Sequence, residues 1–369
     1  GETDRLLDMA SLITPALAGR EQDVLVATGE QVCSALLAMT LESMGERARS
    51  FTGLQLPMIT DDNYSRARIL ELHTDNLMRT IDEGIIPVVA GFQGVTKDGN
   101  VTTLGRGGSD TTAVAIAAAL RADRCEINTD VDGVYTADPN ICPRARHLSK
   151  ISYQEMLELA GLGAKVLHAR SVELAQKYNV PLVVKLSSGG ERETWIVNEE
   201  EVMENSIIKG VTLEKNVSKI AILRVPDRPG IAHKILSPLA NAAINVDMII
   251  QNVSVEGYTD FTFTMASTDL EQASKLIEDV VREIGADEFI SANNIVKVSA
   301  VGIGIKTNPG VAARMFRALA SENINIEMIS TSEYRISCVI DEKYGELAVR
   351  AIHRAFDLDD PNRQPQKEQ

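Results

Sequence analysis

The sequence predicts an α/β protein in which a domain with a mainly parallel sheet, flanked by helices, is followed by two copies of a smaller βαββαβ module. Three observations predict this fold class. Apolar runs alternate with helical periodicity from residue 24 to about residue 186, as in proteins with a parallel sheet. A polar, acidic stretch then interrupts the pattern. Beyond it, the segment Val225–Ile250 is repeated as Ile305–Ser330.

The first domain is expected over residues 1–197. Its helices should carry apolar residues at intervals of three and four, and its strands should be short apolar runs. The expected helices lie at residues 29–45, 111–122 and 151–178, and the clearest strands at Ile85–Phe92, Arg124–Asp130 and Asn179–Leu186.

Residues 198–217 are expected to form a linker, followed by modules at residues 218–295 and 296–369. The repeat is visible because Pro229-Gly230 recurs as Pro309-Gly310. In each copy the pattern reads as a split βαβ unit, with the Pro-Gly pair opening its first helix. Glycine at that point allows backbone amides to approach a carboxylate or a facing module, and a plain tight turn is the alternative.

Size and composition limit the classes of function. With 369 residues and 44% hydrophobic residues the chain can form two or three domains. The net charge of −15 argues against a broad phosphate-binding surface, so we expect no nucleic acid partner. No uninterrupted apolar run approaches roughly 18 residues and no secretory signal is present, so we expect a cytoplasmic protein without a membrane partner. The four cysteines form no C-x-x-C pair, which predicts free and mostly buried thiols.

The segment GRGGSD at residues 105–110 lies between an expected strand and an expected helix. Glycines there let backbone amides converge on an anion, and the helix start adds partial positive charge. Arg106 suits a carboxylate ligand, and Asp110 could orient a charged donor or face a metal-bridged phosphate. The segment is neither a Walker A loop nor a dinucleotide fingerprint. It predicts a phosphate or carboxylate cradle, with a glycine-rich turn capped by aspartate as the alternative.

Three weaker candidates surround this segment. Thr129 and Asp130 stand at the carboxyl end of an expected strand, at the sheet edge where α/β proteins bind ligands, and an ordinary β-turn is the more common explanation of such a segment. Glu30 stands near an expected helix start, where glutamate is common in any case. Lys165 stands on an expected helix and is otherwise read as a solvated side chain.

Taken together, these motifs resemble the aspartate kinases. The resemblance covers essentially the whole chain, and the duplicated tail makes it specific, because other kinases of this fold lack it. The motifs that carry it, in order, are GETDRLL, FTGLQLPMIT, VVAGFQG, TTLGRGGSDTT, TDVDGVYTADP, GAKVLHARSVE, VPDRPG and NINIEMISTSE.

The resemblance implies an amino-acid-kinase fold followed by two ferredoxin-like ACT domains. It implies ATP- and Mg²⁺-dependent phosphorylation of the β-carboxylate of L-aspartate to 4-phospho-L-aspartate, the first step of lysine, threonine and methionine biosynthesis. Feedback by lysine, threonine or both would act through the ACT domains. A homodimer or a higher oligomer is implied as well.

The resemblance also implies site residues. Arg106 would clamp a substrate carboxylate, Glu30 would receive the substrate ammonium, and Asp110 would organise the catalytic lysine and the magnesium-bound phosphates. No protein residue is expected to be a direct metal ligand. The implied aspartate site is Thr3, Glu30, Phe92, Arg106 and Ser109, and the implied ATP site is Gly107, Gly108, Thr129, Asp130, Tyr135, Asn140 and Lys165.

The implied effector sites lie in the two ACT domains. Helix-start amides would bind the effector carboxylate, and Asp247 would bind its ammonium. In the first copy these residues are Asp227, Pro229, Gly230, Ile231, Ala232, Asp247 and Gln251. In the second copy they are Asn308, Pro309, Gly310, Val311, Asn325 and Ser330.

Two departures from the family pattern matter. The family opens with a Lys-Phe-Gly-Gly-Thr-Ser strand and loop, which should precede Gly1, and Gly1 itself opens a helical pattern. We therefore expect the chain to be a fragment that is inactive or poorly folded until that segment is supplied. Asn140 stands where the family usually has arginine, which puts one nucleotide contact in doubt. A non-catalytic, amino-acid-sensing regulatory subunit is the alternative function.

Overall fold

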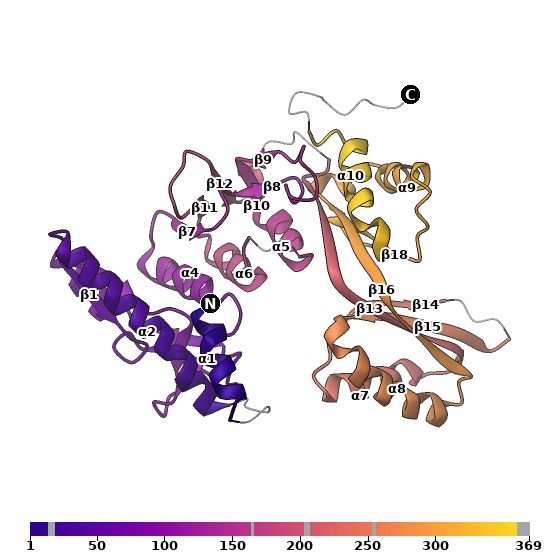
Figure 1. The fold of residues 1–369 in the computed structure, drawn as a ribbon, viewed down its shortest axis with the longest axis horizontal. Helices are drawn as coiled ribbons and strands as arrows, with labels where there is room; N and C mark the ends of the chain where they lie inside the picture. Colours follow the sequence, from indigo (N-terminus) through magenta and orange to yellow (C-terminus); the bar gives the residue numbers. More distant parts are fainter. Residues whose placement is uncertain (14–18, 164–165, 203–206, 253–255, 360–369) are drawn as a thin grey trace. The chain divides into compact units, whose positions relative to one another are not determined.

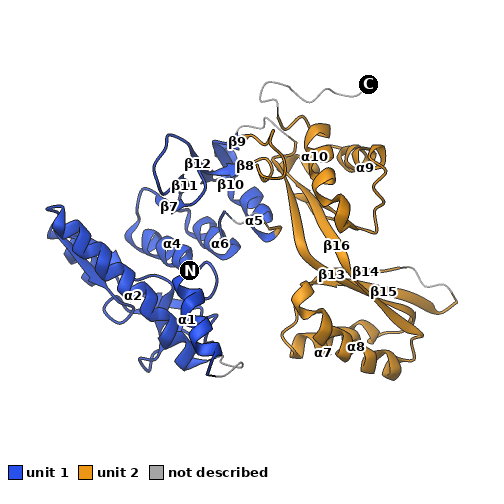
Figure 2. Cartoon of the chain, viewed as in Figure 1, with its two compact units in different colours: residues 1–134, 147–161, 165–203 blue, residues 135–146, 162–164, 204–369 orange. Residues whose placement is uncertain are grey.

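The computed structural model describes residues 1–13, 19–163, 166–202, 207–252 and 256–359. The chain forms two compact units, coloured separately in Figure 2. The first comprises residues 1–134, 147–161 and 165–203, and the second comprises residues 135–146, 162–164 and 204–369. Each unit is described by itself.

The first unit contains helices and several short sheets (Figure 1). A parallel pair joins β1 to β4, one four-stranded sheet has the order β10-β12-β11-β7, and another has the order β3-β2-β5-β6. The strands are β1 (Ala48–Phe51), β2 (Met58–Thr60), β3 (Ile69–Leu72), β4 (Ile86–Val89), β5 (Gln93–Val95), β6 (Val101–Thr103), β7 (Cys125–Thr129), β8 (Val134–Tyr135), β9 (His147–Leu148), β10 (Lys150–Ser152), β11 (Leu182–Leu186) and β12 (Glu193–Val197).

The α/β class is confirmed, but strand pairing in this unit is more mixed than a mainly parallel sheet. The pairs β1–β4, β7–β11, β10–β12 and β2–β5 are parallel, whereas β2–β3, β5–β6 and β11–β12 are antiparallel. The length of the loop between two strands decides whether they pair parallel or antiparallel. Strands β5 and β6 are joined by a short turn closed by the bond from Gly99 N to Thr96 O (2.9 Å), which permits only an antiparallel neighbour.

The helices of this unit differ from the expected ones at their ends. The expected helix at residues 29–45 begins earlier, and the one at residues 151–178 is two helices. The helices are α1 (Glu2–Ser11), α2 (Arg20–Ser43), α3 (Asp75–Asp82), α4 (Gly108–Leu120), α5 (Tyr153–Gly161) and α6 (Ala169–Tyr178), with a short 3₁₀ turn at Glu199–Glu201.

Helix α2 is long and apolar enough, by length and composition alone, to be a membrane-span candidate. The sequence expectation rested on uninterrupted apolar runs and did not single it out. A single such helix near the start of a chain is weak evidence, because core helices pass the same test. Part of α2 packs inside this unit, since Asp23, Val26 and Ala27 are buried.

The second unit is built on one six-stranded sheet with the order β14-β15-β13-β16-β18-β17. Its helices cover the sheet in two groups, α7 with α8 and α9 with α10 (Figure 1). The elements are β13 (Gly210–Pro226), α7 (Ile231–Asn241), β14 (Val246–Gln251), β15 (Tyr258–Met265), α8 (Leu270–Ile284), β16 (Glu288–Val301), α9 (Val311–Ser321), β17 (Met328–Thr331), β18 (Arg335–Asp341) and α10 (Gly345–Ala355), with 3₁₀ turns at Ser267–Asp269, Ile303–Ile305 and Glu342–Tyr344.

The sequence repeat is also a structural repeat. Gly230 and Gly310 cap α7 and α9 with φ angles of 92° and 95°, in the left-handed region that favours glycine. Each copy has its own apolar core, one around Phe261 and Phe263, the other around Met315 and Leu319. The glycines therefore set the same turn twice.

The closing strand of the second copy comes from an unexpected place. Residues 210–214, which the sequence assigns to the linker, form the start of β13 and pair with residues 297–301 of β16. The later part of β13 pairs with β15 and with the start of β16, and so belongs to the first copy. The first copy is thus inserted between the closing strand of the second copy and the rest of it.

The segment Tyr135–Arg146 belongs to the second unit. Ala137 and Cys142 lie in the apolar core of the second copy, and Thr136 O accepts a hydrogen bond from Val211 N (2.8 Å). Thr136 Oγ1 is also 2.9 Å from Nε2 of the buried His353 on α10. This segment, which contains two predicted ATP residues, is therefore part of the packing of the repeat unit.

All four cysteines are free, and three of them, Cys125, Cys142 and Cys338, are buried. Burial raises the pKa of Cys125 to about 11 and that of Cys338 to about 12. These thiols are therefore protonated and unreactive at neutral pH.

Candidate functional site

The glycine segment forms a tight loop that ends where α4 begins. Gly105 and Gly107 have φ angles of 78° and 68°, which only glycine adopts without strain. Space is equally restricted. A Cβ on Gly105 would lie 2.8 Å from Ser65 O, and one on Gly107 would lie 2.3 Å from His168 Cβ. Gly108 N already donates to Gly105 O (2.9 Å). A helix start leaves its first amides without intrahelical partners, so binding of an anion by the remaining amides of this loop stays a prediction.

The polar and charged side chains of this loop differ in exposure. Arg106 and Ser109 are exposed, whereas Asp110 is partly buried in the first turn of α4. Burial raises the pKa of Asp110, and the nearby His168 works against that rise. The loop therefore offers an accessible guanidinium beside a carboxyl group that is only partly hydrated.

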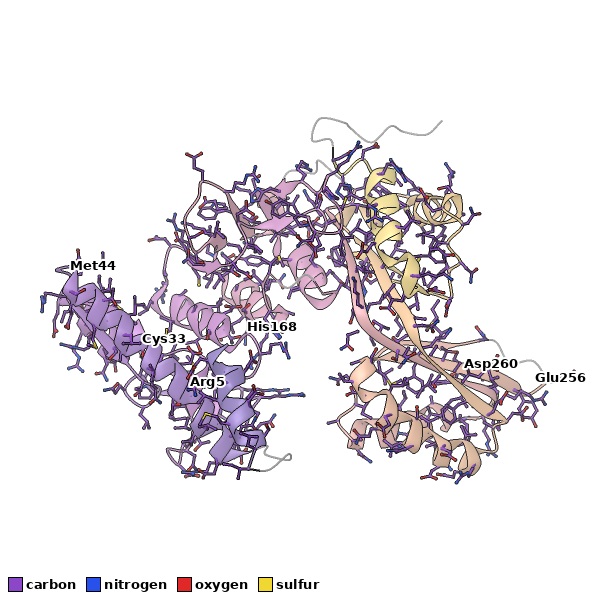
Figure 3. The ribbon with its side chains drawn as sticks, in the orientation of Figure 1. Arg5, Cys33, Met44, His168, Glu256 and Asp260 are labelled. Carbon is purple, nitrogen blue, oxygen red and sulfur yellow. The ribbon has the colours of Figure 1, made fainter. Side chains whose placement is uncertain are left out.

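His168 comes to this loop from a distant part of the sequence. It caps the start of α6, which lies beside α4 (Figure 1). Its side chain is labelled in Figure 3, and its Nδ1 atom is buried without a hydrogen-bond partner among the described residues. Two helix starts, those of α4 and α6, thus meet at the glycine loop.

Asp23 fixes the strand that leads into the glycine loop, and sequence reasoning missed it. Its fully buried carboxylate on α2 accepts hydrogen bonds from Thr103 N (2.7 Å) and Thr103 Oγ1 (3.0 Å). It also accepts bonds from Ser65 N (3.0 and 2.9 Å) and Ser65 Oγ (3.1 Å), which hold Ser65 at a φ of 67°. In the sequence Asp23 precedes the expected helix at residues 29–45, and nothing in the pattern indicates this role.

Arg170 is a second support that the sequence did not indicate. Its Nη1 donates to Leu104 O and its Nη2 to Ala67 O, both at 2.8 Å. Desolvation by burial is the main cause that lowers the pKa of Arg170, with Arg68 adding to it. The guanidinium fork joins two backbone segments next to the loop, a geometry that lysine cannot reproduce.

Phe92 lies against the glycine loop, as the predicted aspartate site requires. Its backbone is left-handed, with a φ of 67°, and its O accepts a hydrogen bond from Leu104 N (2.8 Å). Its N donates to Thr112 Oγ1 (3.1 Å), and a Cβ on Gly108 would lie 2.8 Å from its Cδ2. The structure therefore brings Phe92 next to the loop that contains Arg106.

Thr3 and Glu30 come from two packed helices, α1 and α2. Gly29 allows the close approach, because a Cβ there would lie 3.3 Å from Glu2 Cγ and 3.4 Å from Leu6 Cδ1. Burial raises the pKa of Glu30. Within the described parts of the chain, no hydrogen bond or ion pair links either residue to the glycine loop, so their part in an aspartate site stays a prediction.

The predicted nucleotide residues divide between the two units. Thr129 ends β7 and donates from Oγ1 to Asp130 Oδ1 (3.0 Å) in the first unit. Tyr135 and Asn140 belong to the second unit, where the N and Nδ2 of Asn140 donate to Asp138 Oδ1 (2.8 and 3.0 Å). Lys165 lies outside the described residues.

A pocket of about 440 Å³ lies at the start of α9 in the second ACT copy. Its lining includes the predicted residues Asn308, Pro309, Gly310 and Val311, together with residues 331–333 at the end of β17. The predicted residues Asn325 and Ser330 are not part of its lining. The helix start therefore faces an open space, whereas the role of the other two residues stays a prediction.

In the first copy, residues 227–230 are exposed at the start of α7, and Gln251 ends β14. Asp227 N donates to Gly257 O (2.9 Å). Asp247, predicted to bind an effector ammonium, already pairs with the ammonium of Lys297. The side chain of Asp247 is nevertheless 40% exposed and can be reached from solvent.

Within the described ranges, no group of three or more His, Cys, Asp or Glu residues could hold a metal ion. The described residues therefore offer no set of three such side chains that could ligate a metal ion.

Comparison with known proteins agrees with this architecture. The amino acid kinase family matches residues 2–185, and the ACT domain matches residues 219–284 and, in a second form, residues 298–356. The chain is 54% identical over 365 residues to an aspartate kinase of Pseudomonas putida, covering 99% of this chain and 89% of that protein.

Two solved structures of E. coli aspartokinase III are similar. The one in complex with aspartate and ADP, described as the R-state, matches with a TM-score of 0.76 and 27% identity, covering 96% of this chain and 81% of that one. The one in complex with lysine and aspartate, described as the T-state, matches with a TM-score of 0.71 and 26% identity, covering 96% and 80%.

The glycine-loop domain and the paired ACT copies thus define a kinase of the amino acid kinase class with a regulatory tail. Within that class, the identity and the coverage decide the family. The chain belongs to the aspartate kinases.

Proposed function

We propose that this aspartate kinase binds L-aspartate and ATP around the glycine loop and transfers the γ-phosphoryl group to the β-carboxylate. The observation that carries the proposal is the amide-lined start of α4, with Arg106 and Ser109 exposed and Asp110 partly buried beside it. An oxygen of the β-carboxylate attacks the γ-phosphorus, the bond to the β-phosphate oxygen breaks, and ADP leaves with that electron pair. The product is 4-phospho-L-aspartate.

Positioning and charge neutralisation are the main tasks of the protein in such a transfer, because both reactants are anions. The amides at the start of α4 hold an anion, and Arg106 clamps a substrate carboxylate with its planar fork. Ser109 and Phe92 shape the aspartate pocket, and Thr3 and Glu30 complete it, with Glu30 receiving the ammonium. Asp23 and Arg170 act indirectly, by fixing the backbone that leads into the loop.

For ATP we propose Gly107, Gly108, Thr129, Asp130, Tyr135, Asn140 and Lys165. Mg²⁺ fits the donors near the loop, because nucleotide-bound Mg²⁺ keeps several waters and needs at most one or two carboxylates, and Asp110 offers one. When bound, Mg²⁺ neutralises charge on the phosphates. Asp110 would face the metal-bound phosphates and orient a cationic side chain.

We further propose feedback regulation through the ACT copies by lysine, threonine or both. The pocket at the start of α9 supports a carboxylate ligand there, because its lining includes the first residues of that helix and helix starts favour anions. The segment Tyr135–Arg146 supports a link to catalysis, since it contains proposed nucleotide residues and packs into the core of the second copy. A ligand that shifts this packing would change the population of nucleotide-competent protein.

A homodimer or a higher oligomer in the cytoplasm is the proposed setting. ACT domains of this family pair side by side, and β14 and β17 are the two edges of the six-stranded sheet in the second unit. Both edges carry an exposed isoleucine, Ile249 and Ile329, and an exposed edge is suited to pairing with another sheet.

The activity is tested by aspartyl hydroxamate formation with the full-length gene product, ATP and Mg²⁺. We expect product with L-aspartate, and roughly a hundredfold or greater loss in kcat/KM for Arg106→Lys, which keeps the charge but loses the fork. The matched control is Arg121→Lys at the other end of α4, which should retain activity. No product with aspartate would reject the function, and full activity of Arg106→Lys would reject the placement of the pocket.

The alternative, a non-catalytic amino-acid-sensing subunit, is favoured only by the intact pair of ACT copies. It predicts lysine or threonine binding by the full-length protein without any hydroxamate. The same assay therefore separates the two functions.

A further inference from the structure

The two ACT copies meet at a small apolar cluster within the second unit. We call it the module seam, and it consists of Val217, Met248, Ile295, Met328 and Val339, all buried. Met248 and Met328 occupy equivalent positions of the sequence repeat. The seam is therefore the place where the same part of each copy faces the other.

The β-ladder is irregular at this seam. The pairing of β13 with β16 shifts register between Glu214 and Val217 and again between Val217 and Lys219. On either side of these shifts the ladder is regular. Such bulges bend a strand and interrupt its hydrogen bonds, so the sheet that both copies share is irregular at the seam.

Lys297 crosses the seam with a buried ammonium. Its side chain is only 4% exposed, and its Nζ pairs with Asp247 on β14 of the first copy and lies 2.7 Å from Glu214 Oε2 on the part of β13 that completes the second copy. Nζ donates its hydrogen bond to Asp247 Oδ2. Glu214 Oε2 is buried and lies at ion-pair distance from the ammonium, but among the described residues it accepts no hydrogen bond, so Asp247 is the hydrogen-bonded partner of Lys297 and Glu214 its second ionic partner.

A second lysine crosses the seam in the opposite direction. Lys219, on the part of β13 that belongs to the first copy, pairs with Glu327 of the second copy at 2.5 Å. Glu327 and Asp247 are equivalent residues of the repeat. Among the described residues, Glu327 is the only carboxylate within ion-pair distance of Lys219.

We propose that Lys297 is a built-in competitor for the ammonium group of the effector amino acid, and that effector binding to Asp247 transfers Lys297 to Glu214. This rests on the proposed effector role of Asp247. In the free chain Lys297 occupies Asp247. When an effector ammonium approaches the exposed side of Asp247, Lys297 gives up its hydrogen bond to Asp247 and keeps only its ion pair with Glu214.

The transfer is feasible because it leaves no buried charge unpaired. Removing one partner from a buried ion pair is normally costly, whereas here the second carboxylate is already at contact distance. The Arg335 guanidinium, 4.0 Å from Asp247 Oδ1, is a further cation near the same carboxylate. Lys219 has no such second carboxylate among the described residues, so its pair is a fixed contact.

The transfer also removes one ionic contact between the copies. Lys297 on β16 and Glu214 on β13 both belong to the sheet of the second copy, whereas Asp247 belongs to the first. Effector binding therefore breaks the ion pair between Lys297 and Asp247 that links the two copies at the bulged part of the shared ladder. By linkage, any condition that weakens the ion pair between Lys297 and Asp247 raises the effector affinity by the same factor.

Isothermal titration of the full-length protein with L-lysine, and separately with L-threonine, tests the competition. Lys297→Met removes the competitor and should tighten binding of the recognised amino acid by roughly five- to tenfold. Asp247→Asn should weaken binding in both backgrounds. The matched control is Lys219→Met, which removes the reciprocal pair and should leave the dissociation constant within about twofold of the wild-type value.

Lys297→Met leaves two carboxylates facing each other, so the double variant Lys297→Met/Glu214→Gln provides a charge-balanced form if the single variant does not fold. The double variant should show the same increase in affinity for the recognised amino acid. Unchanged or weaker binding in the folded Lys297 variant, together with weaker binding in Asp247→Asn, refutes the competition alone. Wild-type binding in Asp247→Asn instead refutes the effector role of Asp247 and the competition with it.

Discussion

Replacement of Asp23 tests whether the glycine loop depends on a buried carboxylate that lies far from it in sequence. Asp23 is fully buried, and its two oxygens accept backbone hydrogen bonds from Ser65 and Thr103 and hydroxyl bonds from both residues. Thr103 directly precedes Leu104 and the glycine loop. Asp23→Ala removes every acceptor at once, whereas Asp23→Asn keeps the shape and one acceptor oxygen.

The magnitudes follow from these contacts. In Asp23→Ala two buried amides lose bonds to a charged group, each worth about 1.5–3 kcal/mol, so the loss should be about 3–6 kcal/mol. In Asp23→Asn the amide oxygen can keep Thr103 N and Ser65 N, and the amide NH₂ can donate to the two hydroxyls, which rotate to accept. Neutral bonds are roughly half as strong as charged ones, so the cost should be about 1–2 kcal/mol.

Urea unfolding followed by tryptophan fluorescence measures this loss. The chain has one tryptophan, and Trp195 lies on β12 in the same unit as Asp23, so its signal reports on that unit. The control is Glu21→Gln, an exposed carboxylate in the first turn of the same helix, which should change stability by no more than about 0.5 kcal/mol. The order of destabilisation should be Ala, then Asn, then the control.

The reasoning would be refuted if Asp23→Ala lowered the unfolding free energy by less than about 1 kcal/mol, the range of an ordinary surface substitution. It would be refuted equally if Asp23→Asn cost as much as Asp23→Ala. In that case the negative charge, and not the hydrogen-bond acceptors, would be the stabilising feature.

Three further changes are expected to have measurable effects. Gly107→Ala places a Cβ 2.3 Å from His168 Cβ at a φ of 68°, so it should lower kcat and destabilise the first unit by about 1–3 kcal/mol, measured by hydroxamate formation and urea unfolding. In Arg170→Lys the side chain cannot donate to both carbonyl oxygens, so the unfolding free energy measured in urea should fall by about 1–2 kcal/mol. An unchanged unfolding midpoint would show that the guanidinium fork is dispensable. Burial lowers the pKa of His353, so the unfolded chain takes up this proton first, and stability should fall as pH drops below about 6.5. In His353→Gln the amide can still reach Thr136. Its unfolding temperature should change less between pH 7 and pH 5 than that of the wild type. An identical change in both proteins would contradict the assignment of this pH dependence to His353.

The sequence was sufficient for the features that depend on local pattern. The glycine loop, its helix and the duplicated Pro-Gly turns are confirmed, because each requires a particular backbone conformation that few residues other than glycine adopt. The family resemblance is confirmed by the comparisons.

The features that the sequence could not predict depend on long-range contacts. By pattern Asp23 lies before an expected helix and Arg170 lies within one, and only the fold places them at Thr103 and Leu104. The sequence also did not predict the pairing of Asp247 with Lys297. Asp247 was expected to bind a ligand, but its carboxylate already pairs with a lysine of the same chain. A pattern indicates which groups are available, but not which of them satisfy each other.

The repeat in the sequence also concealed the order of the two ACT copies. A tandem repeat predicts two modules that follow each other, each with its own strands. The structure instead gives β13 and β16 to both copies, because residues 210–214 close the second sheet before the first copy begins. A one-residue slip in this ladder would turn the inward side chains of both copies outward, so the copies cannot shift independently along it. Relative motion must therefore occur as bending at the bulged seam, where Lys297 and Lys219 hold the two copies together.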